Sequence, residues 1–577
     1  MKTLNLHVDY IKFKPLKKAL KSIGELSEKD KKEKEVKDAL VVLTAVEKGD
    51  TNVSGVVKEL ISNIKDIASQ VKTKNIVLYP YAHLSKDLGN PEVAQEVLEK
   101  AEKELTRAKF KVTRAPFGYY KEFELKVKGH PLSELSREIR LEETKGGIVK
   151  GKQVEEKYDP KQLLREISKS KLDSSKLKDN DHRILGKQMD LFSFSEVAPG
   201  MVFWHDKGLT IYNELVEFWR EEHKKANYQE IKTPQIMDSK IWKVSGHWDK
   251  YKENNFVTDY EKRPFLIKPM NCPGGMLVFK NSPKSYKDLP LRVGELGVVH
   301  RCELSGVLAG LFRVIQFTQD DAHIFCANEK QVKDEIMGVI KMINYFYKKF
   351  NLTVDHVELS TRPEKRIGSD KDWDMAERIL EEVLKESKTK YKINAGDGAF
   401  YGPKIDYHVK DSLGRTWQLA TIQLDFAMPE RFDLEYTDKD NSKKRPIMLH
   451  RVIYGAIERF IGILLEHTNG RLPLWLSPIQ VRVLSFTDRN VPHAEKFISR
   501  MKELIPNVRV DSDFDQKTVQ AKVKEAEEMK IPYIIVIGDK EEKEGVVAVR
   551  KGGDKVVESL DSDEFIFDLK KKIEMRV

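Results

Sequence analysis

Residues 292–323 read RVGELGVVHRCELSGVLAGLFRVIQFTQDDAH, and this stretch decides the fold of the centre of the chain. Residues 291–301 and 312–319 alternate apolar and polar side chains, as half-buried antiparallel strands do. The loop between them contains Gly306 and Gly310, with Arg301 and Arg313 near its two ends. The stretch therefore predicts two antiparallel strands that present arginines beside a glycine-containing loop.

Two further segments carry uncommon chemistry. Residues 268–274, KPMNCPG, form a loop bounded by proline and glycine that contains a cysteine. Residues 450–466 carry apolar side chains at helical spacing, so we expect a core-facing helix that His450 and Arg451 open. Taken alone, an arginine is more often a surface charge and a cysteine a small buried hydrophobe. These residues by themselves leave their roles open.

The 577 residues suggest about three or four domains at the usual ~150 residues each. Residues 1–145 mix strand-like runs with helical patterns and predict an α/β domain. Residues 146–180, rich in Lys, Asp, Ser and Gly, predict a linker, and residues 181–470 a large central domain. Residues 471–577 show the βαβ rhythm of a small domain with a parallel or mixed sheet.

Composition excludes several classes of protein. No apolar run approaches the ~20 residues of a membrane-spanning helix. Three cysteines, an odd number, argue against a disulfide framework and favour a reducing, cytoplasmic setting. The net charge of +10 permits polyanion binding, but from the charge alone a solvated Lys/Glu surface is the better reading. Neither common glycine-rich phosphate cradle occurs, so a nucleotide would need another kind of site.

The central segments resemble the signature motifs of class II aminoacyl-tRNA synthetases. Arg301-x-Glu303 with the following loop and Arg313 matches the second motif, and Gly455-x-x-Glu458-Arg459 matches the third. The first motif, which is less regular, would end at Pro234. Within the class the chain resembles threonyl-tRNA synthetases through the strings SGHW (245–248), MNCPG (270–274), FTQDDAH (317–323) and AFYGPK (399–404). The resemblance implies an antiparallel catalytic sheet with helices and ATP-dependent ligation of L-threonine to tRNA(Thr) through threonyl-adenylate.

The resemblance also implies which residues handle ATP. Arg301 would hold the α-phosphate and the amino-acid carboxylate, and Arg459 the γ-phosphate. Glu303 would accept from the adenine amine, and Arg313 would lie over the bent triphosphate, with Mg²⁺ bridging the phosphates. Lys404 completes the implied catalytic set. Guanidinium groups suit these roles because they bind phosphate and carboxylate as rigid forks.

One Zn²⁺ per subunit is implied at Cys272, His323 and His450. Three protein ligands leave a coordination position open, which the threonine amino and hydroxyl groups would fill. Valine has no hydroxyl and would be rejected, whereas an apolar pocket alone separates such isosteres only about a hundredfold. Asp321 would accept from the same hydroxyl, and the remaining pocket and transfer site would be lined by Gln319, Tyr401, Gln418 and His247. Gly275 departs from the bulkier residue that is common in the family.

Serine differs from threonine by one methyl group, worth only ~1–3 kcal/mol, so a hydrolytic second site is expected. Residues 1–145 resemble the archaeal editing domain of threonyl-tRNA synthetases, a relative of D-aminoacyl-tRNA deacylases, which points to an archaeal source. The matching strings are HVDY (7–10), YPYAHL (79–84), APFGYYK (115–121) and GHPLSEL (129–135). The resemblance places His83 and Lys121 at the hydrolytic centre, with Tyr120 and Glu134 positioning water and the seryl group. A plain tRNA-docking module is the alternative.

The C-terminal residues resemble an anticodon-binding domain. IPYIIVIGDKE (531–541) and VAVR (547–550) carry this match, with Glu541 and Arg550 as candidates for reading base edges. Residues 511–520 depart from the family pattern. Enzymes of this type are homodimers with the first motif in the interface, so the resemblance implies a homodimer.

Two alternatives compete with a threonine-specific ligase. One is a synthetase for another amino acid, such as proline or serine, against which the Cys272/His323/His450 set and the editing domain argue. The other is a non-catalytic tRNA- or mRNA-binding regulator derived from a synthetase. The presence of Arg301, Glu303, Arg459 and all three metal-ligand candidates favours an enzyme.

Overall fold

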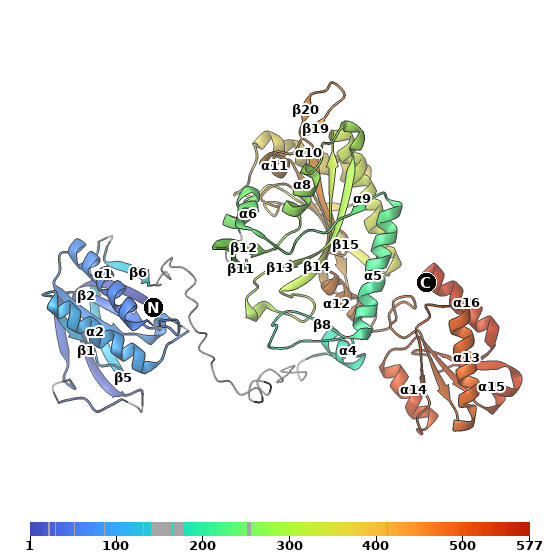
Figure 1. Cartoon of the computed structure of the whole chain (residues 1–577), viewed down its shortest axis with the longest axis horizontal. Coiled ribbons are helices and arrows are strands. Elements are labelled where there is room, and N and C mark those ends of the chain that lie inside the picture. Colours follow the sequence, from blue (N-terminus) through green and yellow to red (C-terminus); the bar gives the residue numbers. More distant parts are fainter. Residues whose placement is uncertain are drawn as a thin grey trace. The chain divides into compact units, whose positions relative to one another are not determined.

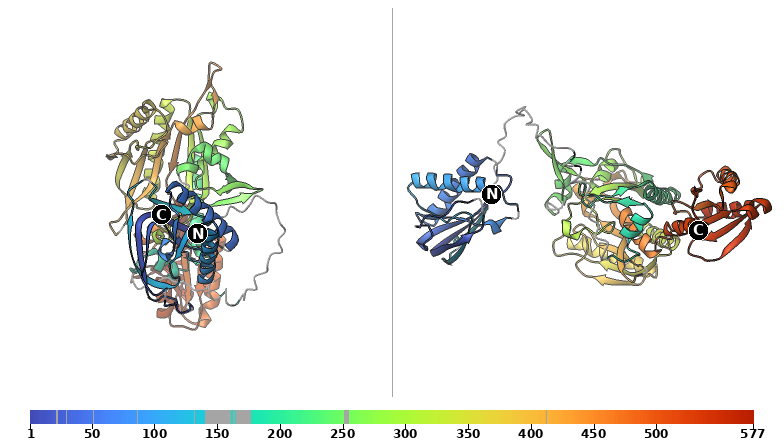
Figure 2. Two further views of the ribbon diagram at one scale, coloured as in Figure 1. Left: turned by 90° about the vertical axis from the view of Figure 1, so that its left-hand side faces the viewer. Right: turned by 90° about the horizontal axis from the view of Figure 1, so that it is seen from below.

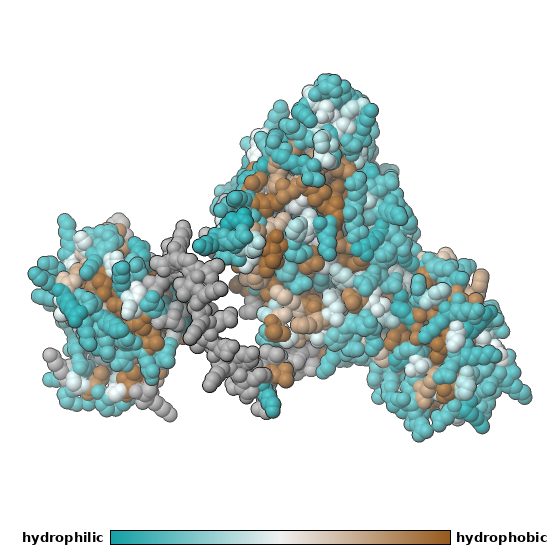
Figure 3. All heavy atoms as spheres, viewed as in Figure 1, coloured by the Kyte–Doolittle hydropathy of each residue, from teal (hydrophilic) through white to brown (hydrophobic). Residues whose placement is uncertain are grey.

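A computed structural model of the chain describes residues 1–139 and 177–577, apart from 21–22, 29, 51, 86, 131, 251–254 and 412, and includes 161 and 164. It divides into two compact units, Met1–Lys157 and Tyr158–Val577, which Figures 1 and 2 show from three sides. Most of the predicted linker at 146–180 lies outside the described residues. On the face seen in Figure 3, hydrophilic side chains cover most of the surface, with apolar patches between them.

The first unit is a mixed sheet of order β4-β3-β2-β1-β5, with β6 also paired to β1. Two amphipathic helices pack on one face of this sheet through a core that includes Leu60, Ile64 and Leu98. The elements are β1 (Lys2–Lys18), β2 (Lys34–Ala45), α1 (Val53–Gln70), β3 (Asn75–Pro80), α2 (Pro91–Arg107), β4 (Lys111–Arg114), β5 (Tyr119–Val127) and β6 (Glu134–Glu138).

The centre of the second unit is an eight-stranded sheet of order β16-β15-β17-β18-β21-β14-β13-β9. Its strands are β9 (Gln229–Glu230), β13 (Leu291–His300), β14 (Gln316–Cys326), β15 (Thr353–Ser360), β16 (Tyr391–Asn394), β17 (Lys404–Lys410), β18 (Thr416–Asp425) and β21 (Ile447–Val452). The six strands from β15 to β13 pair antiparallel throughout, which agrees with the class II sheet expected from the sequence.

Long helices pack against this sheet through one apolar core, which includes Phe218, Ile343, Ile379 and Phe460. These helices are α5 (Asp206–Lys225), α9 (Glu329–Lys349), α10 (Asp370–Glu386) and α12 (Ile457–His467). Short elements at the rim include α4 (His182–Gln188), β7 (Phe192–Ser193), β8 (Phe203–Trp204), β10 (Ile236–Asp238), α6 (Ser239–Ser245), α7 (His247–Lys250), β11 (Val257–Tyr260), β12 (Arg263–Ile267), α8 (Cys272–Lys280), α11 (Ala427–Arg431), β19 (Tyr436–Thr437) and β20 (Lys443–Lys444).

The C-terminal part has a mixed sheet of order β23-β22-β24-β25-β26, in agreement with the sequence prediction. Its elements are β22 (Val481–Ser485), α13 (Val491–Leu504), β23 (Val510–Asp513), α14 (Val519–Glu528), β24 (Tyr533–Ile537), α15 (Asp539–Glu544), β25 (Val546–Lys551), β26 (Val557–Asp561) and α16 (Ser562–Met575).

The prediction that a helix opens at His450 is wrong over residues 450–456. His450 and Arg451 lie in β21, a central strand paired with β14 and β18, and the helix begins at Ile457. The strand is short and buried on both faces, so its apolar residues merge with the helical pattern that follows. Gly455 makes the turn at a φ of 78°, a left-handed conformation that favours glycine.

Candidate functional site

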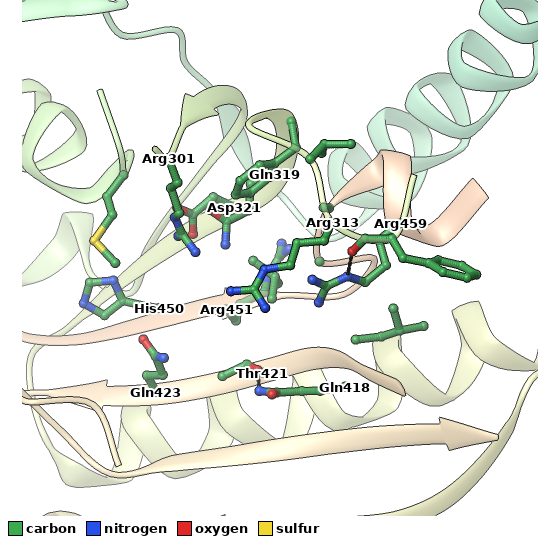
Figure 4. A pocket seen from close by; sticks show the side chains of 18 of the residues that line it. Arg301, Arg313, Gln319, Asp321, Gln418, Thr421, Gln423, His450, Arg451 and Arg459 are labelled. Atoms are coloured by element: carbon green, nitrogen blue, oxygen red, sulfur yellow. Dashed lines mark hydrogen bonds between the residues drawn. The ribbon is translucent and has the colours of Figure 1, made fainter. Parts of the chain in front are cut away.

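A cavity of about 450 Å³ opens on the central sheet between β14, β18 and β21. Figure 4 shows His450 at one end and Arg459 at the other. One wall carries Arg301, Gln319 and Asp321, and the facing wall carries Gln418, Thr421 and Gln423. Side chains from all three predicted sequence segments therefore meet in one space.

The three predicted arginines all line the cavity, with Arg313 and Arg459 together at one end and Arg301 nearer His450 (Figure 4). Arg313 donates to Oε2 of Glu303 at 2.8 and 3.1 Å, and Nε of Arg459 donates to the backbone oxygen of Phe312 at 2.8 Å. The Arg301 guanidinium lies over the Phe317 ring, 5.2 Å from its centroid. Each guanidinium is thus oriented by a neighbour, and Glu303 is the only one of the predicted acids to pair with one of them among the described residues.

The electrostatics of this end favour an anion. Burial lowers the pKa of Arg459, and the charges of Arg313 and Arg301 lower it further, while Glu303 opposes them. Neighbouring cations repel one another, and a bound polyanion stabilises them because it neutralises their charge. The predicted triphosphate would supply that charge.

Neutral polar groups and one carboxylate line the other end. Nδ2 of Asn271 donates to Asp321 Oδ2 at 3.2 Å, and the Tyr401 hydroxyl donates to Gln423 Oε1 at 2.6 Å. Asp321, Gln319, Tyr401 and Gln418 line the cavity as the sequence predicts. Thr421 and Gln423 line it too and were missed, although both lie on the strand that carries Gln418.

Two predicted residues lie behind the cavity wall. His247 is buried, contacts the Phe400 ring at 5.5 Å between centroids, and has a pKa lowered to about 3 by burial. Lys404 donates to Asp406 at 2.7 Å and to Asp397 at 2.9 Å. Asp406 in turn accepts from Gln418 and Thr421. Both residues reach the cavity through others, so a direct catalytic role for either stays a prediction.

The three predicted metal ligands come together. Donor atoms of Cys272, His323 and His450 all lie within 4.8 Å of one another, and all three residues are buried. His323 and His450 are direct partners in the β14–β21 ladder, and Cys272 is the first residue of α8. The strand register, rather than any sequence spacing, brings the histidines together.

The cluster fits a zinc ion. Nε2 of His323 is buried and makes no hydrogen bond within the described part of the chain. Burial lowers the pKa of His323 to about 4, which keeps its imidazole in the neutral, metal-binding form. Burial and then the Asp321 and Asp425 carboxylates raise the pKa of the Cys272 thiol, and a bound cation would reverse that shift. A Cβ on Gly275 would lie 3.4 Å from Nδ1 of His323, an ordinary van der Waals contact, so position 275 borders this ligand.

Two buried carboxyls that belong to the quoted motifs, but to which the sequence assigned no role, fix the junction between β14 and α12. Asp320 accepts from the amides of Ile453 and Gly455 at 2.9 Å, and burial raises its pKa to about 7. Glu458 accepts from the amide of Thr318, and burial raises its pKa to about 8. These two carboxyls fix the turn that leads into α12, the helix that carries Arg459.

His182 supports the arginine loop from outside the cavity. Its Nδ1 lies 2.7 Å from Glu466 Oε1, and its Nε2 accepts from the Leu311 amide at 2.9 Å. A Cβ at position 310 would lie 2.2 Å from this nitrogen, so Gly310 permits the close approach. No sequence motif pointed to this histidine.

A second cavity, of about 520 Å³, lies in the first unit. Three predicted editing residues, His83, Tyr120 and Lys121, line it. Glu134 is an exposed residue of β6, paired with Leu6, and does not line this cavity. Its predicted place beside the seryl group is therefore not seen in this unit.

Lys121 is the distinctive group of that cavity. Its Nζ donates to the backbone oxygens of Pro116 and Tyr119, both at 2.9 Å, and lies 5.2 Å from the Tyr79 ring centroid. Burial lowers its pKa to about 8. The amine therefore titrates close to neutral pH beside an aromatic wall, which suits proton transfer.

The two predicted anticodon residues have structural partners. Glu541 Oε2 accepts from the Gly538 amide at 3.0 Å and caps α15. Arg550 lies 3.4 Å from Glu527. Base reading by either residue stays a prediction.

The fold and the arginine-lined cavity define a class II aminoacyl-tRNA synthetase core. Residues 252–468 match the family described as the class II tRNA synthetase core domain for G, H, P, S and T. Residues 1–139 match the archaea-specific editing domain of threonyl-tRNA synthetase, and residues 480–572 match an anticodon-binding domain.

Individual relatives show which synthetases of this class the chain is similar to. The chain is 51% identical over 451 residues to a threonine–tRNA ligase from Caldanaerobacter subterraneus, covering 77% of this chain and 69% of that one. It is 54% identical over 397 residues to a threonine–tRNA ligase from Desulforamulus reducens, covering 69% and 61%. A crystal structure of the RNA-binding domain of threonyl-tRNA synthetase from Cryptosporidium parvum is 39% identical, with a TM-score of 0.65, covering 68% and 98%.

The chain belongs to the threonine–tRNA ligase family. It spans less than two thirds of the length of the Desulforamulus relative. Among the described residues, no helix combines the length and apolar character needed to cross a bilayer.

Proposed function

We propose that this chain ligates L-threonine to tRNA(Thr) with ATP, through threonyl-adenylate. The observation that carries the proposal is the single cavity with a guanidinium cluster at one end and Cys272, His323 and His450 at the other. Such a cavity can hold a triphosphate and an amino acid with the reacting carboxylate and α-phosphate between them. Holding two reactants in line supplies much of the rate enhancement expected for such a transfer.

At the nucleotide end the arginines bind and orient. Arg301 holds the α-phosphate and the carboxylate, Arg459 the γ-phosphate, and Arg313 the bent tail, with Mg²⁺ as counter-ion. Glu303 pairs with Arg313 before ATP enters. When ATP binds, Glu303 leaves Arg313 and accepts a hydrogen bond from the adenine amine. The guanidiniums stabilise charge that develops as pyrophosphate leaves.

At the amino-acid end Cys272, His323 and His450 would hold one Zn²⁺. When bound, the ion would supply open coordination positions for the amino and hydroxyl groups of threonine. Asp321 accepts from the hydroxyl, while Gln319, Tyr401 and Gln418 enclose the side chain. Lys404 acts through Asp406, and His247 through Phe400 and the adjacent Tyr401, as positioning residues.

Threonine-dependent ATP–pyrophosphate exchange tests the ligase, with serine and valine in parallel, before and after zinc chelation. We expect exchange with threonine, weaker exchange with serine, negligible exchange with valine, and loss of exchange with zinc. No exchange by folded, zinc-loaded protein would leave the non-catalytic tRNA- or mRNA-binding regulator as the better reading.

We further infer that the first unit hydrolyses mischarged L-seryl-tRNA(Thr). The supporting observation is the separate cavity in which Lys121, His83 and Tyr120 face one space. Deacylation of seryl-tRNA and threonyl-tRNA by the full chain tests it, with Lys121→Met as the variant. Lys65→Met, on α1 outside the cavity, is the matched control. Equal hydrolysis by Lys121→Met and the unchanged chain would remove the editing assignment.

The remaining proposals rest on family membership. They are anticodon reading by Glu541 and Arg550, a homodimer, and a cytoplasmic location. Light scattering of the full chain tests the dimer, and tRNA binding by Arg550→Ala tests the anticodon contact.

A further inference from the structure

A second cluster of metal-type donors lies on the central sheet, away from Cys272. His356 and Glu358 are two positions apart on β15 and so share one face of the sheet. His408 on β17 is the direct cross-strand partner of His356. Two imidazoles and a carboxylate therefore meet on adjacent strands that the ladder holds in register.

The distances within the cluster match a coordination shell. Nε2 of His356 lies 3.3 Å from Glu358 Oε1, and Nε2 of His408 lies 3.5 Å from Glu358 Oε2. One donor atom from each residue falls within 4.8 Å of the other two. Ligands about 2.1 Å from a tetrahedral ion lie roughly 3.4 Å from each other, which agrees with both distances.

Neighbouring groups orient these donors. The Asp355 carboxylate lies 2.7 Å from Nδ1 of His356, which assigns the proton to Nδ1 and leaves the Nε2 lone pair facing the cluster. Nδ2 of Asn394 donates to Glu358 Oε2 at 2.9 Å. Nε2 of His408 is buried and has no hydrogen bond among the described residues. Orientation of a ligating histidine by a carboxylate at its other nitrogen is a recurrent property of metal sites.

The third group of possible ligands in the described residues does not share these properties. In the Asp181, His182 and Glu466 group, both ring nitrogens of His182 are already hydrogen-bonded, to Glu466 and to the Leu311 amide. No donor of that histidine is left for an ion. The His356 cluster keeps two imidazole nitrogens that face a carboxylate.

We propose that His356, Glu358 and His408 form a second site for a divalent transition metal ion such as Zn²⁺. Two imidazoles and one carboxylate suit zinc, copper, nickel or iron better than the harder Mg²⁺ or Ca²⁺. The two rings are stacked, with centroids 4.4 Å apart and planes at 7°, so both rings would have to tilt for their Nε2 lone pairs to meet at a common ion. All three residues are partly exposed, which leaves room for water as a further ligand.

The site would lie beside the proposed aminoacylation cavity. His408 pairs across the ladder with Gln418, which lines that cavity. Asp406, two positions from His408 on the same face, binds the Gln418 and Thr421 side chains. An ion here would cross-link β15 to β17 one strand away from Gln418.

Metal content of the full chain, measured after saturation with zinc and removal of free ion, tests the proposal. The unchanged chain is expected to hold two zinc ions per chain, and His408→Gln and Glu358→Gln one each. Cys272→Ser is also expected to lose one ion, so the double variant Cys272→Ser/His408→Gln holds none. The control is His205→Gln, because His205 is a partly exposed histidine paired with Asp190 and lies outside both clusters.

Cobalt substitution identifies which ion is lost, without any activity assay. Cobalt at Cys272 gives a thiolate charge-transfer band, whereas cobalt bound by His356, Glu358 and His408 gives only ligand-field bands. His408→Gln should remove ligand-field absorption and keep the charge-transfer band. One zinc per unchanged chain, or two that His408→Gln and Glu358→Gln leave in place, would overturn the proposal and reduce the cluster to an ion pair.

Discussion

Oδ2 of Asp425 lies 2.8 Å from Nε2 of His450, and both side chains are buried. The other oxygen of Asp425 accepts from the amides of Ala427 and Met428 at 2.8 and 2.9 Å. The two backbone amides thus fix the Asp425 carboxylate, which in turn fixes the orientation of the His450 ring. A carboxylate in this position keeps the second ring nitrogen available to a metal.

Asp425→Asn should weaken zinc binding about 10–100-fold, the usual cost of losing such a partner. The amide can still cap Ala427 and Met428, so we expect the fold to persist. Competition for zinc with a chelator measures the change, and Cys272→Ser marks complete loss at this site. Zinc affinity equal to that of the unchanged chain would show that Asp425 does not orient the ligand.

Arg459→Lys should lower kcat for ATP–pyrophosphate exchange by about 10²–10³-fold, as for loss of one preorganised donor. Lysine keeps the charge but cannot donate to Phe312 and a phosphate as a rigid fork. The rates are compared with those of Arg500→Lys, because Arg500 is an exposed arginine of α13 that pairs with Glu503. A change in KM for ATP alone would mean that Arg459 contributes only to ground-state binding.

Deacylation of seryl-tRNA should rise with pH through about 8 and then level off. The pKa of Lys121 is lowered to about 8 by burial, so the neutral amine, which can accept a proton, becomes the major form above that pH. Enzymatic rates are corrected for spontaneous ester hydrolysis with Lys121→Met. A rate that falls across the same range would assign the role to the ammonium ion instead.

The free energy of unfolding of the central domain should fall as pH rises from about 6.5 to 8, above the range in which the buried His247 and His323 oppose this trend through their lowered pKa values. Burial raises the pKa of Glu458 to about 8, so the folded state binds a proton that the unfolded chain has released. The stabilisation is complete below the unfolded pKa and is lost as pH passes the folded pKa. One such proton gives a slope of at most ~1.4 kcal/mol per pH unit.

Glu458→Gln should reduce that slope, because the amide does not titrate. Urea unfolding at several pH values, followed by tryptophan fluorescence, measures it, with Glu503→Gln on α13 as control. Asp320, whose pKa is raised to about 7, should supply the remaining slope. An unchanged slope in Glu458→Gln would mean that Glu458 is ionised in the folded state at neutral pH.

Local pattern predicted the central strands because alternation and helical periodicity are encoded within about ten residues. Residues 312–315, expected to begin the second strand, instead lie in the loop before β14. The family resemblance predicted the fold class through motifs rather than through packing, and the family matches confirm it. The strand at Ile447–Val452 was not predicted, because its buried residues continue into the helical pattern of α12.

Contacts that depend on register could not be predicted from the sequence. The register between β17 and β18 shifts between Asp406 and His408, and this irregularity lets Gln418 and Thr421 both reach Asp406. The proximity of His323 and His450 likewise follows only from the pairing of β14 with β21, and Cys272 reaches them from the start of α8. His182 acts through its two ring nitrogens, which no local pattern reveals.

The pairing of His323 with His450 has a consequence for assembly of the sheet itself. A slip of one residue between β14 and β21 would turn one of these imidazoles to the opposite face. A misregistered molecule could then not retain the ion that the two rings and Cys272 are proposed to share. The amount of zinc bound at this site would therefore equal the amount of correctly assembled protein in a preparation. Metal uptake during refolding would report the formation of the native sheet.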